Sequence, residues 1–202
     1  MSDMREGLER EVKYAVLSPC GPEAFPWGSI GLQCSRAGRI VTEAVYWDTP
    51  VLSLYRLHAS VRYRTHDGWT MKEAAGSEGA FTVRRELVFP GGPDGMPQDI
   101  RDRLSTGGFT GELEVVARLS TTREVFHLAA EDGAVLAELV CDEVRVPEVP
   151  GARFMELEVE MKGGDTRLEE DIVSILDHED AIARESRSKL THALEILGRL
   201  AP

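Results

Sequence analysis

The sequence is poor in the residues and segments that mark several large classes of protein. It has three cysteines in 202 residues, Cys20, Cys34 and Cys141, with no CxxC spacing, so neither a disulfide scaffold nor a structural zinc site is expected. No stretch approaches the 18 apolar residues of a membrane-spanning helix, and residues 1–15 hold several acids where a signal peptide would be apolar. These absences predict a cytoplasmic protein with no membrane partner.

Basic residues are also the minority among the charged ones. The chain has 23 lysines and arginines against 35 aspartates and glutamates, a net charge of −12 and a pI of about 4.9. General affinity for nucleic acids depends on a basic surface, so no nucleic-acid partner is predicted. A small polyanion in a local basic pocket remains compatible with this charge, because local fields can oppose the net charge.

What the sequence does have is a period-two pattern, within a length that suits a single domain over residues 1–202. Apolar and polar residues alternate, as is typical of strands, over residues 8–17, 40–47, 59–66, 69–75, 80–89, 112–118, 122–128, 134–146 and 153–162. Residues 18–38 are rich in glycine and proline and predict a loop with room for a short helix. A short helix is expected near 97–105, and the tail after residue 166 changes to helical spacing. The pattern predicts an α+β fold, as an open antiparallel sheet or a closed barrel with helices outside.

The polar faces of these strands are rich in arginine and carboxylate. In the stretch EREVKY, Glu9, Glu11 and Lys13 share one face, because successive side chains of a strand point to opposite faces. An ordinary antiparallel sheet with one wet face gives the same alternation. If the sheet closes on itself, however, these charges line a lumen, where they are costly unless they meet counter-charges, metals or ligands. Carboxylates opposite basic side chains then suit a divalent ion bound to a polyphosphate.

The ordered set of charged motifs resembles the CYTH domain, the triphosphate tunnel metalloenzyme superfamily. The pattern ExExK at Glu9, Glu11 and Lys13 is similar to its signature. The motifs that follow in order are YWDTP at 46–50, Arg62-x-Arg64, Lys72, Arg84-x-Glu86, Asp142, ELEVE at 156–160 and SKL at 188–190. The resemblance extends from residue 9 to about residue 197.

This resemblance implies a closed eight-stranded antiparallel β-barrel that forms a tunnel, with flanking helices. It implies hydrolysis of inorganic triphosphate, nucleoside triphosphates or thiamine triphosphate with Mg²⁺ or Mn²⁺. The implied metal ligands are Glu9, Glu11, Asp142, Glu156 and Glu158. The implied phosphate-binding residues are Lys13, Arg62, Arg64, Lys72, Arg84, Arg123 and Lys189, and the implied catalytic set is Glu9, Glu11, Lys13, Arg62, Arg64, Lys72 and Glu158. Arg118 and Arg123 are alternatives for one basic position, of which Arg123 is predicted.

Two other functions stay open at this point. A class IV-type adenylate cyclase would need a base pocket and a positioned ribose, for which the sequence offers no residues. A non-catalytic polyphosphate- or nucleotide-binding domain would keep the basic set without needing the four metal-side glutamates, Glu9, Glu11, Glu156 and Glu158. A homodimer is a further expectation, since dimers are common among soluble proteins.

Overall fold

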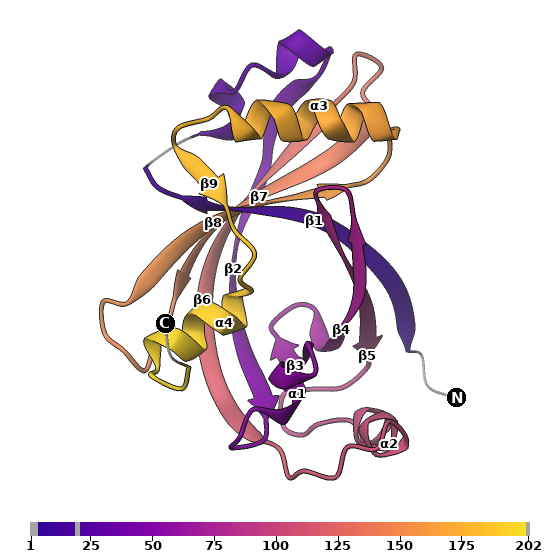
Figure 1. Cartoon of the computed structure of the whole chain (residues 1–202), viewed down its shortest axis with the longest axis vertical. Helices are drawn as coiled ribbons and strands as arrows, with labels where there is room; N and C mark the ends of the chain where they lie inside the picture. The colour runs from indigo at the N-terminus through magenta and orange to yellow at the C-terminus, as the bar shows by residue number, and fades with distance from the viewer. Residues whose placement is uncertain (1–3, 19–20, 201–202) are drawn as a thin grey trace.

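The computed structural model shown in Figure 1 describes residues 4–18 and 21–200 of the chain. Cys20 lies outside the described residues. The strands are β1 (Arg5–Val16), β2 (Gln33–Asp48), β3 (Ala59–Arg64), β4 (Gly68–Glu78), β5 (Phe81–Phe89), β6 (Glu114–Ala129), β7 (Val135–Arg145), β8 (Arg153–Met161) and β9 (Ile182–Arg184). The helices are α1 (Ser53–Arg56), α2 (Gln98–Thr106), α3 (Thr166–Asp177) and α4 (Lys189–Ile196), with short 3₁₀ helices at Pro22–Ala24 and Trp27–Ile30.

Eight of the strands close into an antiparallel barrel. The order β5-β4-β3-β2-β6-β7-β8-β1 is completed by pairing of β1 with β5. Along β1, residues 5–11 pair with β5 and residues 11–15 pair with β8 on the opposite edge. The short strand β9 pairs with residues 14–16 of β1 beyond the end of β5. This architecture confirms the predicted fold class of a closed eight-stranded barrel with flanking helices.

The apolar faces of the barrel strands point outward and are covered by helices. Ile172 and Leu176 of α3 are buried in one cluster with Val12 of β1 and Val159 of β8. On another side, α2 buries Ile100 and Leu104 in a cluster with side chains of β3, β4 and β5. Because the core lies between the barrel and its helices, the opposite, charged faces of the strands are left to line the interior.

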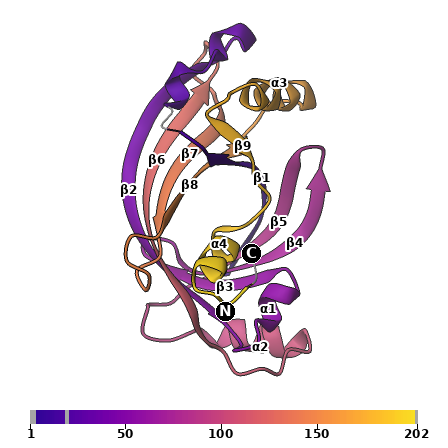
Figure 2. The same ribbon diagram turned by 60° about the vertical axis from the view of Figure 1, so that its left-hand side comes forward.

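Helix α4 is the exception, since it lies between the walls of the barrel (Figure 2). Its residues Leu190, Ala193 and Leu194 share a buried cluster with Tyr46 of β2 and Val144 of β7. Leu190 and Tyr46 also line the interior cavity. The helix therefore fills part of the barrel interior with apolar side chains and brings its N-terminal end to the charged part.

The structure differs from the sequence predictions in three strands, one of which is β9, a short strand within a tail predicted as helical. Residues 33–38 were predicted as loop but belong to β2, and the two strands predicted at 112–118 and 122–128 are the single strand β6. The reason is one long ladder, in which β2 pairs with β6 from Gln33–Ala129 to Asp48–Glu114 with two irregularities in register. Within the described part of the chain, no helix is long and apolar enough to cross a membrane.

Candidate active site

The barrel encloses a cavity of about 780 Å³, within the range usual for small-molecule sites. Its lining includes ten lysines and arginines against six glutamates, although the whole chain carries a net charge of −12. The lining contains ten of the predicted site residues, namely Glu9, Glu11, Lys13, Arg62, Arg64, Lys72, Arg84, Arg123, Glu158 and Lys189. The interior is thus a basic pocket within an acidic protein.

Strand pairing places opposite charges directly across from each other in this lining. Lys13 of β1 is the register partner of Glu158 of β8, and Lys72 of β4 is the partner of Glu86 of β5. Arg123 of β6 is likewise opposite Asp142 of β7. Directly opposite residues on one face of an antiparallel pair lie close enough to interact, so the register itself sets up the ion pairs of the site.

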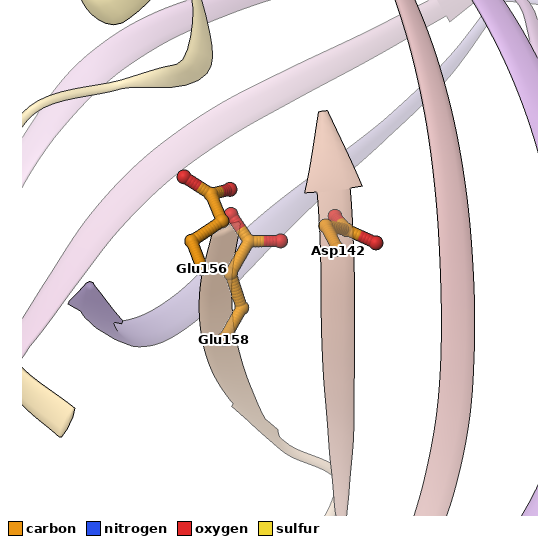
Figure 3. A group of neighbouring side chains, drawn as sticks. All are labelled: Asp142, Glu156 and Glu158. Carbon is orange, nitrogen blue, oxygen red and sulfur yellow. The ribbon is translucent and has the colours of Figure 1, made fainter. Parts of the chain in front are cut away.

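Three carboxylates gather where β7 and β8 run side by side (Figure 3). Oxygen atoms of Asp142, Glu156 and Glu158 all lie within 4.8 Å of one another. The side chains of Asp142 and Glu156 are 0% and 1% exposed, and that of Glu158 is 12% exposed. Such a group of buried carboxylates needs positive charge nearby to be stable.

Three cations of the protein supply that charge. The Nζ atom of Lys189, at the start of α4, lies 3.0 Å from Asp142 Oδ2 and 3.0 Å from Glu158 Oε1, and it also contacts Glu156. Lys13 Nζ lies 2.7 Å from Glu158 Oε1. Arg123 donates from Nε and Nη2 to the two oxygens of Asp142 at 2.9 and 2.7 Å, a bidentate geometry.

These contacts set the protonation states. Burial raises the pKa of Glu158, but the charges of Lys13, Lys189 and Arg123 outweigh it, so the pKa lies well below the usual range. Burial lowers the pKa of Lys189, but the carboxylates of the cluster outweigh it, and the pKa lies well above the usual range. Both groups are therefore charged at neutral pH.

A second group of charges lies on the wall made by β1, β3, β4 and β5. Lys72 Nζ contacts Glu9 and lies 3.5 Å from Glu86 Oε1. Arg62 Nη1 donates to the hydroxyl of Tyr46 at 3.4 Å, and its Nη2 is 4.0 Å from Glu86 Oε1. This wall joins the basic residues of the middle strands to the first carboxylate of the ExExK motif.

Two side chains in the cavity sit beside charges of their own sign. Glu11 is 8% exposed, and its pKa is raised by burial and by the charges of Glu158 and Glu9. The pKa of Arg64 is lowered by burial and by the neighbouring Arg62. A bound cation would relieve the first arrangement and a bound anion the second, because each adds the opposite charge.

The donor set fits a divalent ion. Glu11 lines the cavity near Glu158, and both buried oxygens of Glu156 lack a hydrogen-bond partner of normal geometry among the described residues. Carboxylate oxygens are the ligands that Mg²⁺ takes in combination with phosphate oxygens and water. The arrangement can therefore hold a hard cation beside a polyanion.

Of the two candidate arginines on β6, Arg123 faces the interior. Arg118 lies on the outside, where its side chain is 55% exposed and its Nη1 is 3.6 Å from Glu148 Oε1. The predicted metal ligands Asp142 and Glu156 lie behind the cavity wall, in contact with Lys189, which lines it.

Sequence reasoning missed some residues of the cavity lining. Arg56, His58 and Arg187 line it, but none was a candidate. They lie on a short helix, at the turn that follows it and on the segment between β9 and α4. Strand alternation carries no signal for positions outside strands, so these residues are identified only from the folded structure.

Comparison with known proteins agrees with this geometry. The family described as CYTH domain matches residues 7–194. Two uncharacterized proteins of Mycobacterium tuberculosis are each 30% identical over 140 residues, which is 68% of this chain and 27% of theirs. The match thus spans about a quarter of the length of these curated relatives.

Two solved structures share the fold. A candidate adenylyl cyclase from Hippeastrum, described as having a dominant triphosphatase activity, has a TM-score of 0.56 at 16% identity, covering 96% of this chain and 98% of that one. A candidate adenylate cyclase from Bacillus halodurans has a TM-score of 0.50 at 15% identity, covering 91% and 97%. At these identities the likeness establishes the fold alone.

Proposed function

Because the chain belongs to the CYTH domain family, we propose that its tunnel is an active site that hydrolyses a triphosphate with Mg²⁺ or Mn²⁺. The observation that supports this most is the excess of basic side chains around a cavity that also holds buried carboxylates. The negative charge of a triphosphate complements the basic side chains, and the carboxylates suit the divalent ion that accompanies it.

In this proposal the basic wall binds the phosphate oxygens. Arg62, Arg64, Lys72 and Arg84 come from three neighbouring strands, β3, β4 and β5, and all line the cavity. Arginine forks and lysine charges held in a water-poor site stabilise the negative charge on the transferred phosphoryl group and on the leaving pyrophosphate. Positioning and charge neutralisation of this kind are the main requirements of phosphoryl transfer.

The carboxylate side would hold the metal, with Glu9, Glu11, Asp142, Glu156 and Glu158 as its ligands. A divalent ion, when bound, supplies charge neutralisation and a more acidic water. Lys13 and Lys189 contact the same carboxylates, so they would balance the cluster and reach the phosphates from that side. The substrate would then lie between the basic wall and the carboxylate cluster with its metal.

The test is a phosphate-release panel with tripolyphosphate, ATP, GTP and thiamine triphosphate, each with Mg²⁺, with Mn²⁺ and with EDTA. We expect release from at least one substrate, with loss in EDTA. Glu11→Gln and Arg62→Ala should each lower the rate by at least about a hundredfold, as loss of one charge-stabilising group typically does. Arg118→Ala, on the outer face, is the matched control and should keep the rate. No release from any substrate would overturn the proposal in favour of a non-catalytic binder.

Cyclisation of ATP is the alternative that the same panel addresses, with cyclic AMP measured beside phosphate. Among the described residues, the aromatic rings lining the cavity are those of Tyr46, Tyr55 and His58. The Tyr46 hydroxyl accepts from Arg62 at 3.4 Å. Cyclic AMP as the main product would replace the hydrolase with a cyclase. A homodimer and a cytoplasmic location remain predictions from the sequence.

A further inference from the structure

The turn between β3 and β4 is held firmly against β2. Thr65 N donates to Glu43 O at 3.0 Å, and Glu43 N donates back to Thr65 Oγ1 at 2.9 Å. Within the turn, Asp67 N donates to Arg64 O at 3.2 Å. His66 and Gly68 have left-handed backbone angles, with φ of 75° and 82°. This backbone brings Asp67 back over the residue that ends β3.

The side chain of Asp67 binds the guanidinium of Arg64. Asp67 Oδ2 accepts from Arg64 Nε and also contacts Nη2. Arg64 Nη1 forms no hydrogen bond or ion pair with any described residue. One edge of the guanidinium is thus occupied by Asp67, and the other edge is available to a ligand.

The two residues belong to different surfaces. Arg64 lines the tunnel, whereas Asp67 lines a separate cavity of about 480 Å³ with Tyr63 and Phe89. Asp67 therefore holds Arg64 from behind and leaves the tunnel free for substrate. It is also the ion-pair partner of an arginine whose pKa is lowered by burial and by the charges of Arg62 and Arg123.

We propose that Asp67 is a positioning residue, which fixes the Arg64 guanidinium so that its free edge meets the phosphate chain. This inference rests on the proposed function of the tunnel. An arginine gains affinity when it is already ordered, because less rotamer freedom is lost on binding. Without Asp67, repulsion by Arg62 and Arg123 would favour conformers of Arg64 that leave the tunnel.

A purely electrostatic view makes the opposite prediction. Asp67 is a negative charge near a polyanion site, so its removal would by itself tighten substrate binding. Positioning predicts weaker binding. Ordering one long side chain is worth about 0.5–1.5 kcal/mol, so Asp67→Asn should raise KM and the metal-free dissociation constant for tripolyphosphate about two- to twelvefold, with kcat little changed.

The experiment measures tripolyphosphate binding by calorimetry without metal, and KM and kcat with metal, in wild type and Asp67→Asn. Asp94→Asn is the charge-matched control, since Asp94 is exposed in the segment between β5 and α2 and lines neither cavity. Asp67→Glu keeps the carboxylate and should return KM toward that of wild type. Melting temperatures establish that each variant is folded.

Arg64→Ala completes a double-mutant cycle. In that background Asp67→Asn should no longer weaken binding, because there is no guanidinium to position. Unchanged or tighter binding by Asp67→Asn alone, in a wild type that binds and hydrolyses, would overturn the inference and leave the proposed function standing. A wild type that neither binds nor hydrolyses tripolyphosphate or the other triphosphates would overturn the proposed function, and the inference with it.

Discussion

We expect the loss of the Lys189 charge to lower the stability of the metal-free protein more than the loss of any other cation of the site. Lys189 Nζ contacts all three carboxylates of the buried cluster, and its side chain is only 11% exposed. Lys189→Met keeps the length and apolar stem of the side chain and removes only the charge. The carboxylates of Asp142, Glu156 and Glu158 would then rely on Lys13 and Arg123.

The expected cost follows from this burial. Removing one partner of a buried ion pair costs about 3–5 kcal/mol, because the remaining charge is left without compensation. For a chain of this length such a loss lowers the melting temperature by about 6–20 °C. Lys162→Met is the matched control, since Lys162 pairs with Glu160 at 2.9 Å but both side chains are more than a third exposed. It should cost about 1 kcal/mol or less.

The assay is thermal unfolding of wild type and both variants, first in EDTA and then with Mg²⁺. We expect the large loss in EDTA for Lys189→Met alone. Mg²⁺ should stabilise this variant more than wild type, because the ion replaces the missing charge and binds only the folded protein. Equal melting temperatures for the two variants would refute the reasoning that Lys189 compensates the cluster.

Three further predictions concern the other charges. Arg123→Ala should cost about 3–5 kcal/mol in urea unfolding, since it removes the bidentate partner of a buried carboxylate, whereas Arg118→Ala should cost less than about 1 kcal/mol. Burial and neighbouring carboxylates raise the pKa of Glu11 in the folded protein, so its charged form is disfavoured there. Glu11→Gln should therefore be more stable than wild type at pH 7, a gain that disappears below the unfolded pKa of about 4.3. The pKa of Glu185 shifts in the opposite direction, because hydrogen bonds from Arg187 lower it to about 2. The stability that Glu185 contributes at neutral pH should be lost between about pH 4.3 and pH 2, so the melting temperatures of wild type and Glu185→Gln should converge there.

The sequence predicted the wall of the tunnel well, because alternation in a strand directly specifies a face. Glu9, Glu11 and Lys13 share the interior, while Val12 and Tyr14 are buried against the outer helices. The same rule failed where a strand lacks clear alternation. Residues 33–38 of β2 carry polar residues and glycine, and their strand conformation comes from pairing with distant residues of β6.

Contacts between distant elements also lay beyond the sequence. Lys189 is the first residue of α4, and nothing in its local pattern shows that it lies between Asp142 and Glu156. Likewise, nothing local to the turn between residues 59–66 and 69–75 shows that the Asp67 carboxylate binds Arg64. Side-chain partners of this kind depend on register and on the packing of helices, which follow from the whole fold.

Strand β1 pairs with two different strands along its length, and this has a consequence for the order in which the barrel folds. Strands β2 to β8 pair with neighbours in the sheet as synthesis proceeds, but residues 11–15 of β1 pair with residues 156–160 of β8. Contacts of such long sequence separation form late and slow folding, because a long loop must close first. Until β8 has emerged from the ribosome, residues 12–15 of β1 have no strand partner, because β5 pairs only as far as Glu11 and β9 is made after β8. The carboxylates of β1 and β8 cannot meet before that point. If a divalent ion binds the carboxylates of β1 together with those of β7 and β8, its binding would show that the barrel has closed.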